Sequence, residues 1–276
     1  MNLHQHYQQF VATHPRRKQR IAGAEWEYII CGAGPETLLL LPGGFGVADT
    51  AFRYLQAFKA EYRVISVSYP TTITTVAGLV DGLATLLAHE QVAQAHVLGG
   101  SYSGMIAQSL VRRYPDLVAT LILSHTGAPN SARTIWNRAC CGLVRALPTR
   151  LLRAVLHGLN RGFLPGKSAD QCFWRGYFAA MIATETRASV LNRLWVLADF
   201  DRNYRFTSGD LRAWAGRILI AEATHDGLIP ARERAALQRL YPQAQCWVFP
   251  AGDHADTITQ PEPQIALIRS FLAAGA

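Results

Sequence analysis

The sequence predicts an α/β protein in which a mostly parallel sheet is covered by helices on both faces. Two observations support this prediction: short, nearly continuous apolar runs recur along the chain, and amphipathic segments with helical spacing separate them. Strands that are buried on both faces show continuous apolar runs, because both rows of side chains pack against helices. A chain of 276 residues, half of them hydrophobic, can form one such domain with an insertion.

The apolar runs place seven strands. They are expected at 25–31, 37–41, 63–69, 95–100, 119–125, 217–223 and 244–250. Helices are expected at 76–90, 104–115, 231–242 and 262–273. Alternation of strands with helices of this length is typical of parallel sheets.

The segment 129–209 interrupts this alternation. It is rich in Trp, Leu and Arg and has few strand signals, so we expect a helical cap inserted over the carboxyl edge of the sheet. The α/β core then comprises 21–128 and 210–276. The polar residues 1–20 are expected to form a loosely held N-terminal arm.

The positive charge of the chain is concentrated in this insertion. The net charge is +8, and residues 129–212 hold twelve arginines and Lys167 against five acidic residues. Residues 149–165 predict an amphipathic helix whose basic face holds Arg150, Arg153, His157 and Arg161 and whose apolar face holds Leu152, Val155, Leu156, Leu159 and Phe163. This pattern favours a lid whose apolar face covers a pocket. It leaves open weak association with an anionic membrane surface, or guidance of an acidic substrate.

Several classes of protein are disfavoured by composition. The longest apolar runs are far shorter than the roughly 20 residues that span a bilayer, and the polar start does not resemble a secretory signal, so a cytoplasmic protein is expected. Five cysteines without CxxC spacing indicate neither disulfides nor zinc, and no metal or other cofactor is expected. No basic groove with stacking aromatics is visible, which argues against a nucleic-acid partner. Oligomeric state is not indicated.

The stretch HVLGGSYSGMIAQ, residues 96–108, places Ser101 in a sharp turn between a strand and a helix. Such a turn exposes a nucleophile and requires small residues two positions before and after it. Gly99 and Ser103 occupy those positions, so this is G-x-S-x-G with serine in place of the last glycine. Taken alone, the motif also fits an ordinary glycine-rich turn.

A base and an orienting acid follow Ser101 in chain order. Asp226, in THDGLIP, and His254, in AGDHADT, each come directly after a predicted strand. Singly, Asp226 could cap a helix and His254 could be a surface residue. Because the carboxyl ends of parallel strands share one edge, we expect the three side chains to meet as a Ser-His-Asp triad.

An oxyanion formed beside Ser101 would need backbone donors. The N–H of Tyr102, at the start of the helix, is one candidate. The turn LPGGFG supplies the second from Phe45 or Gly44. This turn lacks the G-K-[ST] ending of a phosphate loop, which argues against nucleotide binding.

These motifs together resemble the α/β-hydrolase superfamily over about residues 21–128 and 210–276. Within the superfamily, the segments LPGGFG, YRVISVSYP and LGGSYSGMIAQSLVRRYP are similar to its maspardin-like branch. The resemblance implies an eight-stranded, mostly parallel sheet flanked by helices, with Ser101 as nucleophile, Asp226 as acid and His254 as base. The chain departs from most members because PTTITT, after the third strand, lacks the common D-x-R-G-x-G-x-S run.

The sequence therefore predicts a carboxylic ester hydrolase that forms an acyl-enzyme with a medium-sized, largely apolar acyl substrate. Members that use an Asp nucleophile, the haloalkane dehalogenases and epoxide hydrolases, are disfavoured by serine at position 101. A non-catalytic scaffold of the maspardin-like type, and a lyase or acyltransferase using the same pocket, remain alternatives. Candidate pocket residues are His125, Trp136, Trp174 and Trp195; His125 also fits a hydrogen-bonded loop residue, and the tryptophans also fit packing roles.

Overall fold

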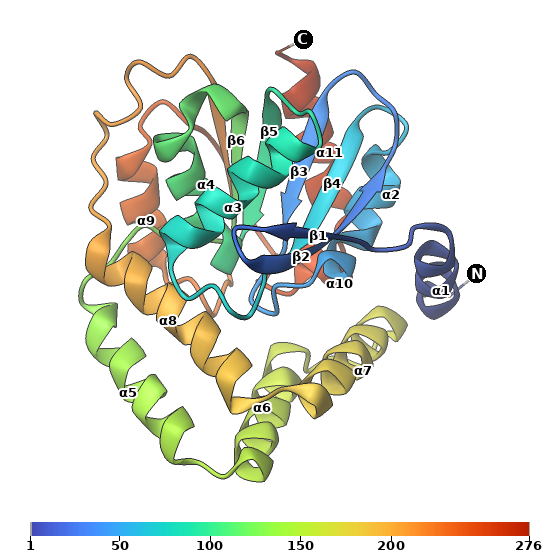
Figure 1. Ribbon diagram of the computed structural model, residues 1–276, viewed down its shortest axis with the longest axis vertical. Helices are drawn as coiled ribbons and strands as arrows, with labels where there is room; N and C mark the ends of the chain where they lie inside the picture. The colour runs from blue at the N-terminus through green and yellow to red at the C-terminus, as the bar shows by residue number, and fades with distance from the viewer. Residues whose placement is uncertain (1, 276) are drawn as a thin grey trace.

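The computed structural model describes residues 2–275 and contains one sheet of eight strands (Figure 1). Its order is β1-β2-β4-β3-β5-β6-β7-β8. The strands are β1 (Arg17–Ile21), β2 (Ala24–Cys31), β3 (Thr37–Leu41), β4 (Arg63–Ser68), β5 (Ala95–Gly100), β6 (Val118–Ser124), β7 (Arg217–Ala223) and β8 (Gln245–Phe249). All seven predicted strands are present, with ends within one residue of the prediction.

The six strands from β4 to β8 along the sheet pair in parallel, whereas β1 and β2 are antiparallel to their neighbours. The prediction of an eight-stranded, mostly parallel sheet is therefore confirmed. In the parallel part, β5, β7 and β8 all end at the same edge, so the loops after them lie close together.

Helices cover both faces of this sheet. Those of the core are α1 (Leu3–Thr13), α2 (Phe52–Phe58), α3 (Val76–His89), α4 (Tyr102–Arg113), α9 (Ala231–Leu240), α10 (Asp256–Thr259) and α11 (Glu262–Ala273), with short 3-10 turns at Ala48–Ala51 and Pro115–Leu117. The four helices predicted in the core are present, with ends within two residues of the prediction.

Alternation of side chains along the central strands divides the interior into two cores. Leu39 and Leu41 of β3 pack on the face that α3 and α4 cover. Leu38 and Leu40 point the other way, toward α2 and α11. Successive strand residues face opposite sides of a sheet, so one apolar run serves both cores. Figure 1 shows α3 and α4 in front of the sheet and α11 behind it.

The N-terminal arm is not loosely held, and this expectation was wrong. Residues 3–13 form α1, whose Phe10 is buried in the same hydrophobic core as the apolar side chains of α2. Arg17–Ile21 form an edge strand of the sheet. The guanidinium of Arg16 binds the buried carboxylate of Asp49, with Nε and Oδ1 3.0 Å apart. Arg16 and Asp49 are 33 residues apart in the sequence, so the sequence around Arg16 did not indicate this contact.

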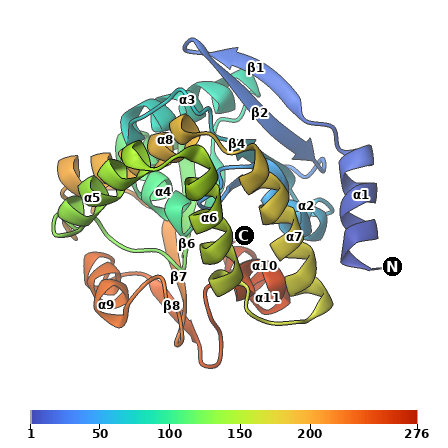
Figure 2. The ribbon, with the colours of Figure 1, turned by 90° about the horizontal axis from the view of Figure 1, so that it is seen from below.

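The insertion between β6 and β7 consists of helices and loops. Its helices are α5 (Arg133–Ala146), α6 (Thr149–Phe163), α7 (Ala169–Thr184) and α8 (Arg187–Asn203). Helix α5 packs along α8 and α6 packs along α7, and Figure 2 shows these helices on the side of the molecule seen from below. The guanidinium of Arg133 binds both Asp201 on α8 and Glu233 on α9, which ties the insertion to the core. Across residues 2–275, we find no helix with the length and apolar character needed to cross a membrane.

Candidate active site

Ser101 occupies a strained turn between β5 and α4. Its φ of 51° and ψ of −120° lie in a region that side-chain-bearing residues rarely adopt. The turn is held by β6 and the segment after it: the Ser101 N–H donates to the Ser124 carbonyl at 2.9 Å, and the Thr126 hydroxyl donates to the Ser101 carbonyl at 2.7 Å. Strain of about 1–3 kcal/mol persists only where surrounding contacts enforce it.

The small residues around Ser101 are required by close packing. A Cβ added at Gly99 would lie 2.7 Å from the Ser103 carbonyl oxygen, and one at Gly104 would lie 2.4 Å from Thr126 Oγ1. The position two residues after Ser101 tolerates serine because its hydroxyl has partners. Ser103 Oγ donates to the Pro42 carbonyl and lies 2.9 Å from the Tyr69 hydroxyl.

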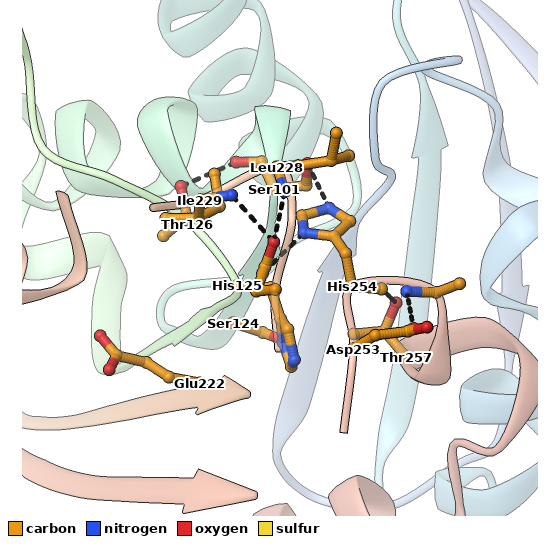
Figure 3. Close-up of polar contacts among 12 residues, drawn as sticks. Ser101, Ser124, His125, Thr126, Glu222, Leu228, Ile229, Asp253, His254 and Thr257 are labelled. Atoms are coloured by element: carbon orange, nitrogen blue, oxygen red, sulfur yellow. Dashed lines mark hydrogen bonds and ion pairs between the residues drawn. The ribbon is translucent and has the colours of Figure 1, made fainter. Parts of the chain in front are cut away.

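The structure brings Ser101, His254 and Asp226 together in one hydrogen-bonded chain. Figure 3 shows Ser101 beside His254. His254 Nε2 lies 2.9 Å from Ser101 Oγ, and His254 Nδ1 lies 2.8 Å from Asp226 Oδ2. Ser101 is only partly buried, whereas His254 and Asp226 are buried. The group that would attack is therefore the most accessible of the three.

The Asp226 carboxylate is prepared to stay ionised. Burial by itself raises its pKa, but hydrogen bonds from His254 and from the backbone N–H groups of Leu228 and Ile229 outweigh burial, and the pKa lies below its ordinary value. The two N–H groups donate to Oδ1 at 2.9 and 2.8 Å. Oδ1 thus fixes the carboxylate, and Oδ2 faces the imidazole.

The two predicted oxyanion donors lie on separate elements that Ser103 joins. Tyr102 is the first residue of α4, and Phe45 lies in a turn that the Gly46 N–H closes on the Gly43 carbonyl at 2.8 Å. The Tyr69 N–H also donates to the Gly46 carbonyl at 2.8 Å. The hydrogen bonds of Ser103 to Pro42 and Tyr69 therefore tie this turn to the start of α4. Gly44 lies in the same turn.

His125, the first residue after β6, is brought next to the triad. Its ring lies edge-on to the His254 ring at 5.7 Å, and its φ of 48° is the second strained conformation at this edge of the sheet. Nδ1 is 2.9 Å from the Ser124 hydroxyl, which also accepts from Gln264. Burial, followed by the nearby positive charge that His254 can carry, lowers the pKa of His125 to about 4. His125 is therefore both hydrogen-bonded and adjacent to the site.

This buried neutral imidazole predicts a loss of stability in acid. The unfolded chain binds a proton near the ordinary pKa of 6.5, whereas folded His125 resists protonation until about 4. The contribution of neutral His125 to the free energy of unfolding is complete above pH 6.5 and is lost as the pH falls from 6.5 to 4. At about pH 4.5 the wild type should have lost about 2–3 kcal/mol more than His125→Asn, measured by urea unfolding across pH.

Asparagine is the suitable replacement because it tolerates positive φ. The comparison is between the pH slopes of the two proteins, since the substitution also changes packing. Asp226, His254, Asp256 and Arg234 also influence the charge of His125 and are retained in both. Parallel pH profiles would show that His125 does not titrate as inferred.

The three predicted pocket tryptophans are not brought to the triad. Trp174 is fully buried; its indole N–H donates to the Ile258 carbonyl at 2.8 Å, and its ring packs against Phe52, so it anchors α7 to the core. Trp136, on α5, is 70% exposed. Trp195, on α8, lies beside Arg145 of α5. Within the described part of the chain, neither of these two rings packs against an aromatic ring of the site. The tryptophans in the sequence indicated large side chains in the insertion, but the sequence did not indicate the direction in which they point.

Other residues of the site were not predicted in these roles. The Phe163 ring, at the end of α6, lies 5.9 Å from the His254 ring. Thr126, Ser124 and Gln264 hold Ser101 and His125 in place. Phe163 was assigned only to an apolar helical face, and the others are polar residues to which the sequence assigned no role. Across residues 2–275, no three His, Cys, Asp or Glu side chains are grouped so that they could hold a metal ion.

The expected lid face is only partly realised in α6. Leu152 is buried, but Val155 and Leu159 from the same predicted face are exposed. Arg153 from the predicted solvent face is partly buried and donates to the Glu185 carbonyl at 3.0 and 2.9 Å. The side of α6 that packs against the rest of the protein therefore differs from the apolar face that the sequence predicted.

Comparison with known proteins agrees with this fold. A family model described as "Alpha/beta hydrolase family" matches residues 38–267. The chain is 22% identical to the proline iminopeptidase PfmaB of Pestalotiopsis fici, with 91% of this chain and 97% of that one covered. It is 25% identical to a pimeloyl-[acyl-carrier protein] methyl ester esterase of Aeromonas hydrophila, with 87% and 96% covered.

A solved thermophilic esterase from Thermogutta terrifontis is also similar. Its TM-score is 0.77 at 22% identity, with 94% of this chain and 98% of that one covered. At this identity the likeness concerns the fold. These findings support the superfamily and do not specifically support the maspardin-like branch. Because the family model covers most of the sequence, the chain belongs to the α/β hydrolase family.

Proposed function

We propose that the protein is a serine hydrolase that cleaves carboxylic esters through an acyl-enzyme. The observation that carries the proposal is the hydrogen-bonded chain from Ser101 Oγ through His254 to Asp226. A serine hydroxyl is a weak nucleophile until a base accepts its proton and a third group orients that base. All three roles are filled here by side chains in hydrogen-bond contact.

In the acylation step, Ser101 Oγ attacks the acyl carbonyl while its proton passes to His254 Nε2. The carbonyl oxygen becomes an oxyanion, for which the N–H groups of Tyr102 and Phe45 are the proposed donors, with Gly44 as the alternative in the same turn. His254 then returns its proton to the leaving alcohol as the C–O bond breaks. Asp226 holds His254 in the tautomer that accepts at Nε2.

In the second step, His254 takes a proton from water, and the resulting hydroxide attacks the acyl-enzyme. Collapse of the second tetrahedral intermediate returns the proton to Ser101 Oγ and releases the carboxylic acid. Replacing water with another alcohol gives acyl transfer by the same route, which keeps an acyltransferase as the nearest alternative.

A medium-sized, largely apolar acyl group is the proposed substrate class. The Phe163 ring beside His254 supplies an apolar surface next to the reacting atoms. The activities named for the Aeromonas and Thermogutta proteins support an ester, whereas that named for PfmaB supports an amide of similar chemistry. An ester needs less activation of the leaving group than an amide does.

The test combines covalent labelling with a series of p-nitrophenyl esters of increasing acyl length. An activated serine should react stoichiometrically with a fluorophosphonate, and mass spectrometry should locate the adduct on Ser101. Ester hydrolysis should show an optimum in acyl length and be lost on labelling. Absence of both reactions would favour the scaffold alternative. Labelling without hydrolysis of any ester would overturn the ester proposal and favour a lyase or acyltransferase.

A further inference from the structure

Helices α5 and α6 carry a strip of apolar side chains that the rest of the described chain leaves exposed. Of the eleven large hydrophobic side chains exposed in residues 2–275, six lie on these two helices. Their exposures range from 46% to 79%. We call them the cap strip: Ile135, Trp136 and Leu143 on α5, and Leu151, Val155 and Leu159 on α6.

The cap strip follows the geometry of each helix. Leu151, Val155 and Leu159 are spaced by four residues, so they form one line along α6, and Ile135 and Leu143 are aligned in the same way on α5. Other side chains of these helices already pack against α8 and α7. Val144 of α5 and Leu152 of α6, for example, are buried. The strip is therefore a second apolar surface on helices whose first is satisfied.

The charge around the cap strip has one sign. Residues 131–168 contain six arginines and Lys167, with no aspartate or glutamate. Four arginines are exposed, and none of the ion pairs found within residues 2–275 involves them: Arg138, Arg145, Arg150 and Arg161. On a helical projection, Arg138 and Arg145 lie on one side of the strip of α5, about 60–80° from Ile135, and Arg150 and Arg161 lie on one side of that of α6, about 80–100° from Leu151.

We propose that the cap strip docks onto the surface of an anionic phospholipid bilayer. Helices that lie in a membrane interface bury an apolar strip at the boundary of the acyl chains and keep flanking arginines among the headgroups. Anionic headgroups complement the unpaired arginines. A second copy of this chain would bring the same excess of positive charge against itself, so self-association through the strip is opposed by repulsion.

The position of the strip in the molecule agrees with this docking. Figure 1 shows the connection between α5 and α6 at the lower end of the molecule, away from the C-terminal end of α11 at the top. Helix α6 runs from Leu151 of the strip to Phe163, which lies beside His254. The docked helix is thus continuous with the candidate site. The docking proposal does not depend on the proposed ester hydrolysis, because membrane binding is measured in the absence of any substrate.

The test is co-sedimentation of the full chain with vesicles of two compositions. We expect binding to mixed phosphatidylglycerol and phosphatidylcholine vesicles, weakened by added salt, and little binding to phosphatidylcholine alone. The triple variant Arg138→Gln/Arg150→Gln/Arg161→Gln should lower the partition coefficient on anionic vesicles by about 100-fold, since each arginine contributes several-fold. These side chains are exposed, so the fold should tolerate the change.

A matched control removes the same charge elsewhere. Arg20→Gln/Arg212→Gln/Arg232→Gln replaces three exposed arginines outside the cap, and its partition coefficient should fall by less than about threefold. A second test variant, Trp136→Gln/Leu159→Gln, keeps the charge and removes apolar area. It should also bind anionic vesicles at least about tenfold more weakly.

Each other outcome overturns the proposal in a specific way. If both triple Arg→Gln variants weakened vesicle binding equally, the attraction would come from the net charge of the protein and not from the cap strip. Absence of vesicle binding would reject the bilayer as occupant. A wild-type dimer that Trp136→Gln/Leu159→Gln converts to a monomer would assign the strip to a second copy. An increased KM for a soluble ester, with vesicle binding unchanged, would instead assign it to the substrate path.

Discussion

Replacing Ser101 with alanine is expected to lower kcat for p-nitrophenyl esters by at least about 10⁴-fold while the protein stays folded. The substitution removes the atom that is placed to attack with His254 as its base, since His254 Nε2 faces Ser101 Oγ at 2.9 Å. Donors for the oxyanion remain, so a small residual rate over water is expected. The measurement is steady-state hydrolysis together with fluorophosphonate labelling, which should be abolished.

Folding should be unaffected because alanine is no more strained at this φ than serine. The contacts that enforce the turn come from the Ser101 backbone and from Thr126, and they remain. Circular dichroism and the unfolding midpoint check this. Ser131→Ala, at an exposed position before α5, is the matched control and should retain full activity. Turnover by Ser101→Ala near the wild-type rate would reject the serine mechanism.

Replacing Asp226 with asparagine is expected to lower kcat by about 10⁴-fold with a small change in KM. Oδ1 of Asp226 accepts from the N–H groups of Leu228 and Ile229. An amide nitrogen cannot accept there, so the asparagine oxygen keeps that position and its NH₂ faces His254 Nδ1. Nδ1 must then accept, the ring proton moves to Nε2, and His254 can no longer take the proton of Ser101.

The control for this variant is Asp253→Asn, which removes the same charge beside His254. Asp253 Oδ1 accepts from the backbone N–H of Ala255 at 2.7 Å, and asparagine retains that acceptor. We expect Asp253→Asn to stay within about threefold of the wild-type kcat, because it does not alter the tautomer of His254. Equal loss in both variants would show that Asp226 acts through charge and not through the tautomer.

Most of the core fold could be predicted because its signals are local. A run such as TLLLL at 37–41 is apolar on both faces, and in the structure it is β3, with alternate leucines in the two cores. The edge strand β1 was missed because RKQRI is polar and pairs only with β2. Only Ile21 of its side chains is buried, so most of its stability comes from pairing with the adjacent strand.

The residues expected to meet at the site were identified by chain order and by the ends of strands. Ser101, Asp226 and His254 follow β5, β7 and β8, and parallel pairing brings these ends to one edge. His125, which follows β6, was a candidate for the same reason, whereas Phe163 could not be placed in this way because its position depends on how α6 packs.

The sequence by itself thus determined the parallel sheet, the helical insertion and the three side chains that meet at its edge, because each depends on a period or a turn within a few residues. Only the tertiary structure decided what the cap does with its apolar faces. Trp174 became an anchor and Trp136 became exposed, although both lie on helices of the cap. Which face of a helix is buried depends on the helix packed against it, and that information lies elsewhere in the chain.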